Sequence, residues 1–258
     1  MMILRTLLAV IRLLLFLLIT LIVYSALLLT NLFYRKKDKK IKRGIVYRRF
    51  IIRLLHIVLG SKITIYGNEP EISGLIISNH RSYFDPLVIL RNILAYPIGK
   101  KEVASWPLIG NVCKTTGVIF VKRDDKESRT ETINEVRCVL ENGFSILNTP
   151  EGTTHIEPTT IKFKPGAFVL AAQLGVPVIP VAVDYKNLDD AWIGDDTFVP
   201  HFLRCFGKWR TEIKVSYLEP IFSNDVDKLI AASKKQIDEE LIRFRKDWNT
   251  TNINQTSH

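Results

Sequence analysis

The feature that most constrains this chain is an uncharged apolar run near its N-terminus. Residues 13–33, LLLFLLITLIVYSALLLTNLF, are twenty-one residues without a charge. An α-helix of that length crosses the hydrocarbon core of a bilayer, which is roughly 30 Å thick. The run lacks the small-residue cleavage site of a secretory signal peptide. The sequence therefore predicts a chain held at a membrane by an N-terminal hydrophobic helix.

The residues on either side of this run predict its orientation. It is followed by RKKDKKIKR, with seven basic residues against Asp38, and preceded only by Arg5 and Arg12 as charged residues. The positive-inside rule then places the rest of the chain on the cytoplasmic side of an inner membrane. The alternative is a helix or helix pair lying in one leaflet, with the basic run at anionic headgroups. Residues 1–43 are expected to form the anchor and its basic run, and residues 44–258 a single further domain.

The net charge of the chain indicates which class of partner it binds. The 36 lysines and arginines exceed the 26 acidic residues and give a formal charge of +10, which fits an anionic partner. The positive charge is densest beside the apolar run, and no nucleic-acid motif interleaves it with aromatic residues. Membrane lipids are thus expected as partners and nucleic acid is not. Cys113, Cys138 and Cys205 lie far apart and match neither a metal site nor a disulfide framework.

Strand-like and helix-like segments alternate along the rest of the chain. We expect strands at residues 75–78, 116–122, 144–148, 176–183 and 211–218. We expect helices at residues 86–95, 126–143, 165–175 and 226–248, and one at 45–60 that fits core packing or, preferably, a membrane surface. Pro177 and Pro180 make the strand at 176–183 an expected edge or irregular strand. This order predicts an α/β fold in which helices flank a central, largely parallel or mixed sheet.

A small group of titratable side chains follows the first of these strands, in NHRSYFD. His80 is the side chain whose ordinary pKa suits a base near neutral pH. Asp85 could bond one ring nitrogen and leave the other free to take a proton. Asp85 could instead cap the helix that begins at Pro86, with His80 bonded to a loop carbonyl. No G-x-S-x-G elbow is present, which favours direct attack by a bound hydroxyl over a covalent hydrolase.

Candidate anion contacts follow the later strands. Arg123 ends GVIFVKR, and its planar guanidinium suits a phosphate, while Lys100 and Lys164 add charge from other loops. In TPEGTTH, Gly152 permits close backbone approach, and Glu151 could bond a substrate hydroxyl or hold the arginine. A solvated arginine and an ordinary turn are the simpler interpretations of these two segments.

Taken together, these blocks resemble the glycerolipid acyltransferases of the lysophosphatidate acyltransferase type. The family's H-x4-D block is matched by His80 and Asp85, and its G-x-I-F-x-x-R block by residues 117–123. Its F-P-E-G-T-R-S block is matched in part by residues 150–153, and its V-P-x-x-P-V-A block by residues 176–182. The lysine that the family places two residues before a glutamate is matched by Lys100. The blocks stand in family order, and the resemblance covers about residues 45–220.

The resemblance implies an acyltransferase domain in residues 44–258, acting in phospholipid biosynthesis. His80 would act as general base on the free hydroxyl of a lysophospholipid, and Asp85 would orient it. The hydroxyl would attack the thioester of acyl carrier protein or acyl-CoA, and neither a metal nor a bound organic cofactor is expected. The residues expected to bind the acceptor are Lys100, Arg123, Glu151, Gly152, Thr153 and Lys164.

Two departures from the family pattern bear on the acceptor. Thr149 stands where the family usually has phenylalanine, and Thr154 stands where it usually has arginine. Loss of that arginine removes a contact to phosphate. The resemblance makes lysophosphatidate the expected acceptor, with a larger-headed lysophospholipid or a lyso-aminolipid as the alternative. A membrane-bound esterase or thioesterase that uses the same His80 and Asp85 with water is the other enzymatic alternative.

Overall fold

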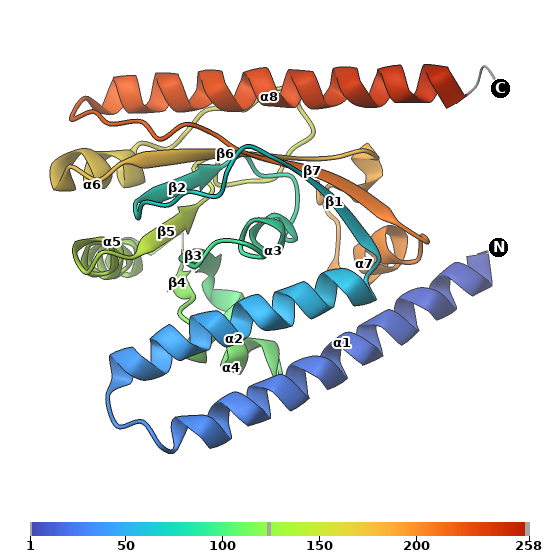
Figure 1. Ribbon diagram of the computed structural model, residues 1–258, viewed down its shortest axis with the longest axis horizontal. Coiled ribbons are helices and arrows are strands. Elements are labelled where there is room, and N and C mark those ends of the chain that lie inside the picture. The colour runs from blue at the N-terminus through green and yellow to red at the C-terminus, as the bar shows by residue number, and fades with distance from the viewer. Residues whose placement is uncertain (1, 123–124, 256–258) are drawn as a thin grey trace.

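The protein begins with two long helices packed side by side (Figure 1). The structure, a computed structural model, describes residues 2–122 and 125–255. Helix α1 (Met2–Asn31) and helix α2 (Lys37–Val58) run in opposite directions and are joined by a short turn. Among the helices that the structure describes, α1 alone is long and apolar enough to cross a membrane.

A seven-stranded sheet forms the centre of the molecule, in the order β1-β7-β6-β2-β5-β3-β4. Every neighbouring pair is parallel except β6 and β7. The ends of β2, β5 and β6 therefore lie at the same edge of the sheet as the starts of β1 and β7. The strands are β1 (Ser61–Tyr66), β2 (Leu75–Ser78), β3 (Ala95–Lys100), β4 (Ile119–Val121), β5 (Ser145–Asn148), β6 (Val178–Tyr185) and β7 (Thr211–Tyr217).

Helices cover both faces of this sheet, as the sequence predicted (Figure 1). Alternation along β2 shows why: Ile76 belongs to the apolar cluster under α2, α3 and α7, whereas Leu75 and Ile77 belong to the cluster under α5, α6 and α8. The remaining helices are α3 (Asp85–Ile89), α4 (Ile109–Thr115), α5 (Lys126–Glu141), α6 (Gly166–Leu174), α7 (Phe198–Phe206) and α8 (Val226–Gln255), with short 3₁₀ turns at Lys101–Ser105 and Leu188–Asp190.

Strand β6 corrects one expectation from the sequence. Its prolines predicted an edge or irregular strand, but β6 lies between β2 and β7 and all its residues are buried. Pairing with β7 starts at Val181, so Pro180 stands at the end of that ladder, where its missing N–H costs at most one hydrogen bond. The carbonyl of Pro180 still accepts a hydrogen bond from Leu218 N at 3.1 Å. The helix expected at residues 86–95 is also shorter, because Ala95 already begins β3.

Helix α2 is fixed to the core by its inner face. Ile45, Ile52 and Leu55 are buried there, while Phe50 is 52 % exposed. Arg48 is buried and donates to the carbonyls of Thr116, at 2.6 Å, and Ala95. Burial lowers the pKa of Arg48 to about 10. Core packing thus accounts for this face, and the expected boundary between residues 43 and 44 falls inside α2.

Helix α1 lies along α2 and α7 through one stripe of side chains. Ala9, Arg12, Thr20 and Leu27 are buried on that stripe, and most of the other apolar side chains of α1 are exposed. Arg12 donates to the carbonyls of residues 206, 208 and 209 at 2.9, 2.6 and 3.0 Å, where α7 ends. A cation is favourable at the C-terminus of a helix, so this arginine attaches α1 to α7.

Candidate active site

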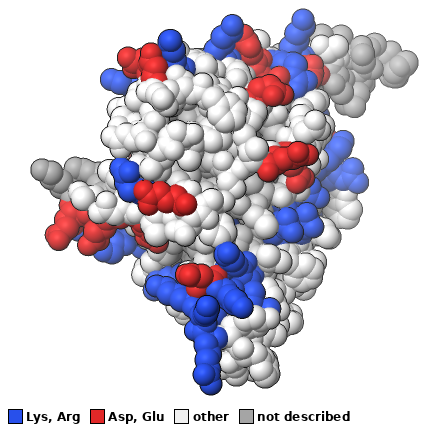
Figure 2. Space-filling model, turned by 60° about the vertical axis from the view of Figure 1, so that its left-hand side comes forward, with Lys and Arg blue, Asp and Glu red and all other residues white. Residues whose placement is uncertain are grey.

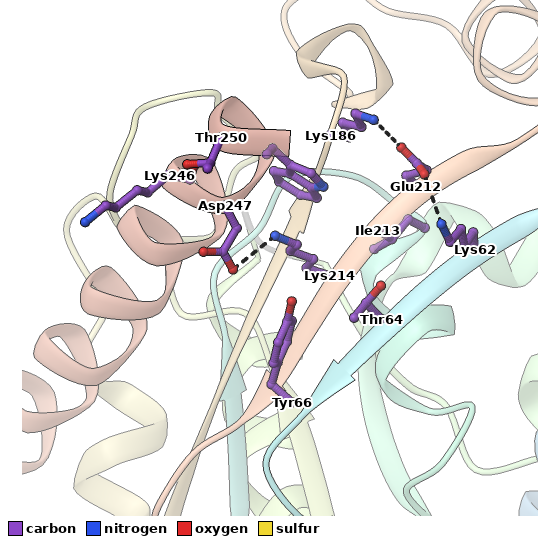
Figure 3. A pocket seen from close by; sticks show the side chains of 11 residues that line it. Lys62, Thr64, Tyr66, Lys186, Glu212, Ile213, Lys214, Lys246, Asp247 and Thr250 are labelled. Atoms are coloured by element: carbon purple, nitrogen blue, oxygen red, sulfur yellow. Dashed lines mark hydrogen bonds and ion pairs between the residues drawn. The ribbon is translucent and has the colours of Figure 1, made fainter. Parts of the chain in front are cut away.

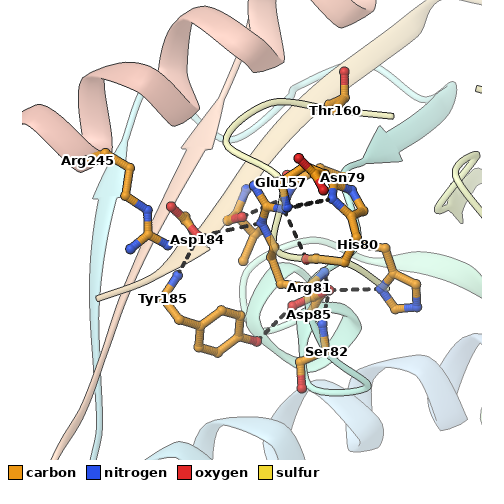
Figure 4. A network of polar contacts seen from close by, with 12 residues as sticks. Asn79, His80, Arg81, Ser82, Asp85, Glu157, Thr160, Asp184, Tyr185 and Arg245 are labelled. Atoms are coloured by element: carbon orange, nitrogen blue, oxygen red, sulfur yellow. Dashed lines mark hydrogen bonds and ion pairs between the residues drawn. The ribbon is translucent and has the colours of Figure 1, made fainter. Parts of the chain in front are cut away.

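The turn between β2 and α3 carries the two predicted catalytic side chains (Figure 4). Nδ1 of His80 lies 2.8 Å from Oδ2 of Asp85. The Asp85 side chain is fully buried, and 16 % of the His80 side chain is exposed. Asn79 holds the end of β2 against β6, because its side chain exchanges two hydrogen bonds with the main chain of Val183 at 2.8 and 2.9 Å. The pair therefore stands on a rigid strand end.

Asp85 is surrounded by donors and does not cap α3. Its Oδ2 accepts from the main-chain N–H of Arg81 at 2.7 Å and of Ser82 at 2.8 Å, both upstream of the helix. Its Oδ1 accepts from the Tyr185 hydroxyl at 2.8 Å. Burial, followed by the charge of Asp85, raises the pKa of Tyr185 well above its usual value, so the phenol keeps its proton and donates. The capping interpretation of Asp85 is wrong: the carboxylate organises the turn that presents His80.

This arrangement fixes the roles of the two imidazole nitrogens. Since Nδ1 of His80 faces a carboxylate that only accepts, Nδ1 carries the proton and Nε2 offers a lone pair. Within residues 2–122 and 125–255, no group makes a hydrogen bond to Nε2 of His80. The pair can therefore take a proton from a hydroxyl placed at Nε2.

Glu151, predicted to contact the substrate, holds the protein main chain. Its Oε2 accepts from the N–H of His80 at 2.6 Å. Its Oε1 accepts from Nε2 of His155 at 2.8 Å and from the N–H of Ile161 at 3.1 Å. The side chain is buried, so both oxygens are occupied by the loop that follows β5 and by the turn that follows β2. Arg123, the arginine that this glutamate could have held, lies outside the described residues.

Two further side chains of the site went unnoticed in the sequence. Arg81 is buried and donates through Nη1 to the carbonyl of His155 at 3.0 Å and to its Nδ1 at 3.1 Å. On its other side, Nε of Arg81 lies 3.6 Å from Asp184, which also binds Arg245 of α8 at 2.6 Å. Burial raises the pKa of Asp184 although both arginines lower it. Arg81 lies in the segment NHRSYFD and His155 in TPEGTTH, but no sequence pattern indicated that their side chains point inward.

The remaining predicted residues lie around this centre. Gly152 has φ +72°, and a Cβ there would lie 2.5 Å from Nζ of Lys164, so the lysine side chain passes over this glycine. Thr153 and Lys164 are exposed on the same loop. Lys100 is exposed at the end of β3, which β5 separates from β2. The structure thus brings Gly152 and Lys164 together, with Lys100 two strands away.

A hollow of about 510 Å³ lies elsewhere, over β1, β7 and the C-terminal part of α8 (Figure 3). Lys214 stands in it, with Nζ 4.6 Å from the ring of Trp248 and 3.4 Å from Asp247. Of the predicted site residues that the structure describes, none lines this hollow. In the described part of the chain, no three His, Cys, Asp or Glu side chains gather in a way that could hold a metal ion.

Comparisons with known proteins place the chain in a family. Residues 62–184 match the sequence model of the Acyltransferase family. The chain is 31 % identical over 195 residues to the lyso-ornithine lipid O-acyltransferase of Pseudomonas aeruginosa, covering 73 % of this chain and 74 % of that protein. It is 36 % identical over 153 residues to the mouse lysophospholipid acyltransferase LPCAT4, covering 55 % of this chain but only 28 % of that longer protein.

The fold has a counterpart among solved structures. The crystal structure of the 1-acyl-sn-glycerophosphate acyltransferase PlsC from Thermotoga maritima is similar with a TM-score of 0.58, over 95 % of this chain and 98 % of that one. The two sequences are 19 % identical, so this likeness concerns the fold. The family match and the bacterial relative confirm the resemblance carried by the sequence blocks: the chain belongs to the glycerolipid acyltransferase family, among the lysophospholipid acyltransferases.

Proposed function

We propose that this enzyme transfers a fatty acyl chain from an acyl thioester to the free hydroxyl of a lysophospholipid. The observation that carries the proposal is the His80–Asp85 pair, in which Nδ1 is held at 2.8 Å by a buried carboxylate and Nε2 is open. These two residues match the histidine and the aspartate of the family's H-x4-D block. His80 and Asp85 are accordingly assigned to catalysis.

The geometry suggests a direct transfer. Nε2 of His80 takes the proton of the acceptor hydroxyl as its oxygen attacks the thioester carbonyl carbon. The new ester C–O bond forms, the C–S bond breaks, and the imidazolium returns the proton to the departing thiolate. Asp85 stabilises the positive imidazolium between these two proton transfers. General-base catalysis of this kind contributes about a hundredfold to ten-thousandfold in rate. The thiol released belongs to coenzyme A or to acyl carrier protein, the two proposed donors.

Two acceptors are consistent with the loop after β5. Lysophosphatidate is the first candidate, with Lys164, which passes over Gly152, as a proposed partner of its terminal phosphate. Lys100, Arg123 and Thr153 are the further contacts proposed from the sequence. A lysolipid with a larger headgroup is the second. It is favoured by Thr154, which replaces the arginine of the family block, and by the bacterial relative, whose name assigns it to lyso-ornithine lipid.

We propose that the enzyme works at a membrane surface through α1. Most apolar side chains of α1 outside its buried stripe are exposed, and the exposed basic run 35–43 forms a cluster at the lower part of the face in Figure 2. Because α1 lies along α2 and α7, its geometry favours an in-plane helix over one that leaves the domain to cross the bilayer. The basic run then contacts anionic headgroups, with the domain on the cytoplasmic side.

The test is an acyl-transfer assay of the purified full-length chain in nonionic detergent. Acyl-CoA and acyl carrier protein thioesters are each offered with lysophosphatidate, lysophosphatidylcholine, lysophosphatidylethanolamine and lyso-ornithine lipid. Formation of a diacyl product that His80→Ala reduces by at least about a hundredfold supports the proposal. Thioester loss with free fatty acid as the sole product would show an esterase or thioesterase instead.

A further inference from the structure

A second hollow, of about 500 Å³, lies at the same edge of the sheet as the His80 turn, where β1 begins and α7 has ended. Its walls come from α1, the end of α2, the start of β1 and the loop before β7. It shares no residue with the acyl-transfer site. The lining residues are Arg12, His56, Ile57, Gly60, Ser61, Lys62, Trp209 and Arg210.

The charge of this hollow has one sign. Three of its lining residues are cationic and none is a carboxylate. Lys62 lies 3.4 Å from Glu212, but Glu212 is shared with Lys186 at 2.7 Å, so this carboxylate serves two lysines. Arg210 is exposed, and no ion pair in the described part of the chain involves it. The hollow therefore offers a site for an anion.

Two buried polar atoms belong to residues that line the hollow and have no partner. Nδ1 of His56 and Oγ of Ser61 make no hydrogen bond to any described residue. His56 donates through Nε2 to the carbonyl of Leu87 at 3.0 Å, which leaves Nδ1 as an acceptor. Buried polar atoms are nearly always hydrogen-bonded, so these two are polar groups in the wall of the hollow that the described residues leave unsatisfied.

Apolar side chains stand beside the cations. Ile57 and Trp209 line the hollow and are each 76 % exposed. They adjoin the part of α1 around Arg12, where Ile11 and Leu15 are 45 % and 44 % exposed. Tryptophan and basic side chains gather at the level of lipid headgroups, where one end of the side chain is apolar and the other is wet. Cations beside exposed apolar side chains suit an amphipathic anion better than a wholly polar anion.

We propose that this hollow binds the phosphate headgroup of an anionic bilayer phospholipid, separate from the acyl acceptor. Lys62 and Arg210 contact the phosphate, and Ile57 and Trp209 reach towards the acyl chains. Bound there, the lipid fixes the depth and tilt of the domain at the membrane. The proposal rests on the membrane contact proposed for α1 and is independent of which acceptor the enzyme uses.

The experiment measures thermal unfolding of the full-length chain in nonionic detergent during titration with dioctanoyl phosphatidylglycerol, an anionic phospholipid. Dioctanoyl phosphatidylcholine and inorganic phosphate are titrated in parallel. The double variant Lys62→Ala, Arg210→Ala is compared with Lys228→Ala, Lys235→Ala, which removes the same charge from exposed positions on α8. All four lysines and arginines are solvent-accessible, so the lipid-free transitions serve as the folding control.

We expect phosphatidylglycerol to raise the transition temperature of wild type and of the α8 variant, because a ligand that binds only the folded state stabilises it. The apparent Kd should weaken roughly fivefold for each cation removed from the hollow. Equal stabilisation of the hollow variant, or equal stabilisation by phosphatidylcholine, would refute the site. An equal effect of inorganic phosphate would refute the lipid assignment. Acyl transfer to a water-soluble acceptor is measured in the same samples. If acyl transfer persists where lipid binding fails, the lipid site is refuted while the proposed function stands.

Discussion

The main-chain N–H of His80 donates to Oε2 of Glu151 over 2.6 Å. This buried carboxylate thereby joins the segments NHRSYFD and TPEGTTH, which match the first and third blocks of the family pattern. The glutamate therefore acts on the position of the proposed catalytic histidine, and each of its oxygens already accepts from the protein. This bond ties the loop after β5 to the turn after β2.

Asp85→Asn should separate catalysis from folding. Oδ2 receives three N–H donors, which an amide oxygen can still accept, and the amide NH2 would then face the Tyr185 hydroxyl, which can reverse its role and accept. The fold should lose less than about 1 kcal/mol. Acyl transfer should fall by about a hundredfold or more, since the imidazolium loses its negative partner. Parallel losses in thermal stability and in rate would contradict this separation.

Tyr185→Phe should affect the turnover more than acceptor binding. The change leaves Oδ1 of Asp85 buried without its donor, which costs about 1–3 kcal/mol of unfolding free energy. We expect kcat to fall severalfold with KM unchanged, because the residue positions Asp85 and does not reach the substrate. Tyr217→Phe is the matched control, since that buried hydroxyl makes a 3.5 Å contact to the Ile89 carbonyl away from the site. An equal effect on kcat in both variants would deny Tyr185 its positioning role.

Glu151→Gln tests whether this side chain holds the main chain or binds substrate. A glutamine has one acceptor oxygen for donors that come from His80, His155 and Ile161. At least one buried donor is left unsatisfied, and we expect a loss of about 1–3 kcal/mol in stability together with a lower kcat. Lys164→Ala, on the exposed side of the same loop, should raise the acceptor KM with little change in stability. A rise in KM alone for Glu151→Gln would restore the substrate-binding role expected from the sequence.

Thr154→Arg restores the arginine of the family block and should discriminate between the two proposed acceptors. With lysophosphatidate as the natural acceptor, the added planar cation should leave the acceptor KM unchanged or lower it. With a larger headgroup, it should crowd that headgroup and shift preference towards lysophosphatidate. The measurement is the ratio of kcat/KM for lysophosphatidate and lysophosphatidylcholine in wild type and variant. An unchanged ratio would mean that position 154 does not face the headgroup.

Acid should destabilise the protein through His56. Burial lowers the pKa of His56 from 6.5 to about 4, so the folded state keeps it neutral where the unfolded chain is already protonated. The free energy of unfolding that the neutral His56 contributes is fully present above pH 6.5. It is lost as the pH falls towards 4, and the full difference is about 3 kcal/mol. Thermal unfolding at pH 7.5 and pH 5 should show about 2 kcal/mol of this loss. His56→Gln should flatten this dependence, leaving a smaller slope in the same direction from His201, whose pKa burial also lowers. An unaltered slope in the variant would refute the assignment.

Local pattern was sufficient for most of the fold. Alternation of apolar strands with amphipathic helices predicted the layered α/β arrangement, and Gly143 and Gly175 marked helix ends where the structure has left-handed backbone, with φ of 75° and 64°. Strands β1 and β3 were missed; the segment of β3, AYPIGK, contains a proline and a glycine, which are uncommon inside strands. The position of β6 was misjudged because a proline is excluded from a central strand only where its N–H would be paired, and pairing is not a local property.

The sequence by itself determined the family and the apolar N-terminal helix, and it predicted the proposed catalytic pair, because each depends on residue types at fixed spacing. Only the tertiary structure decided what those residues touch. It turned Asp85 from a helix cap into an acceptor for its own turn and for Tyr185, 100 residues away in the chain. It likewise turned Glu151 towards His80, 71 residues away. Burial, hydrogen-bond partners and the packing of α1 arise from contacts between distant segments, and no local spacing encodes those contacts.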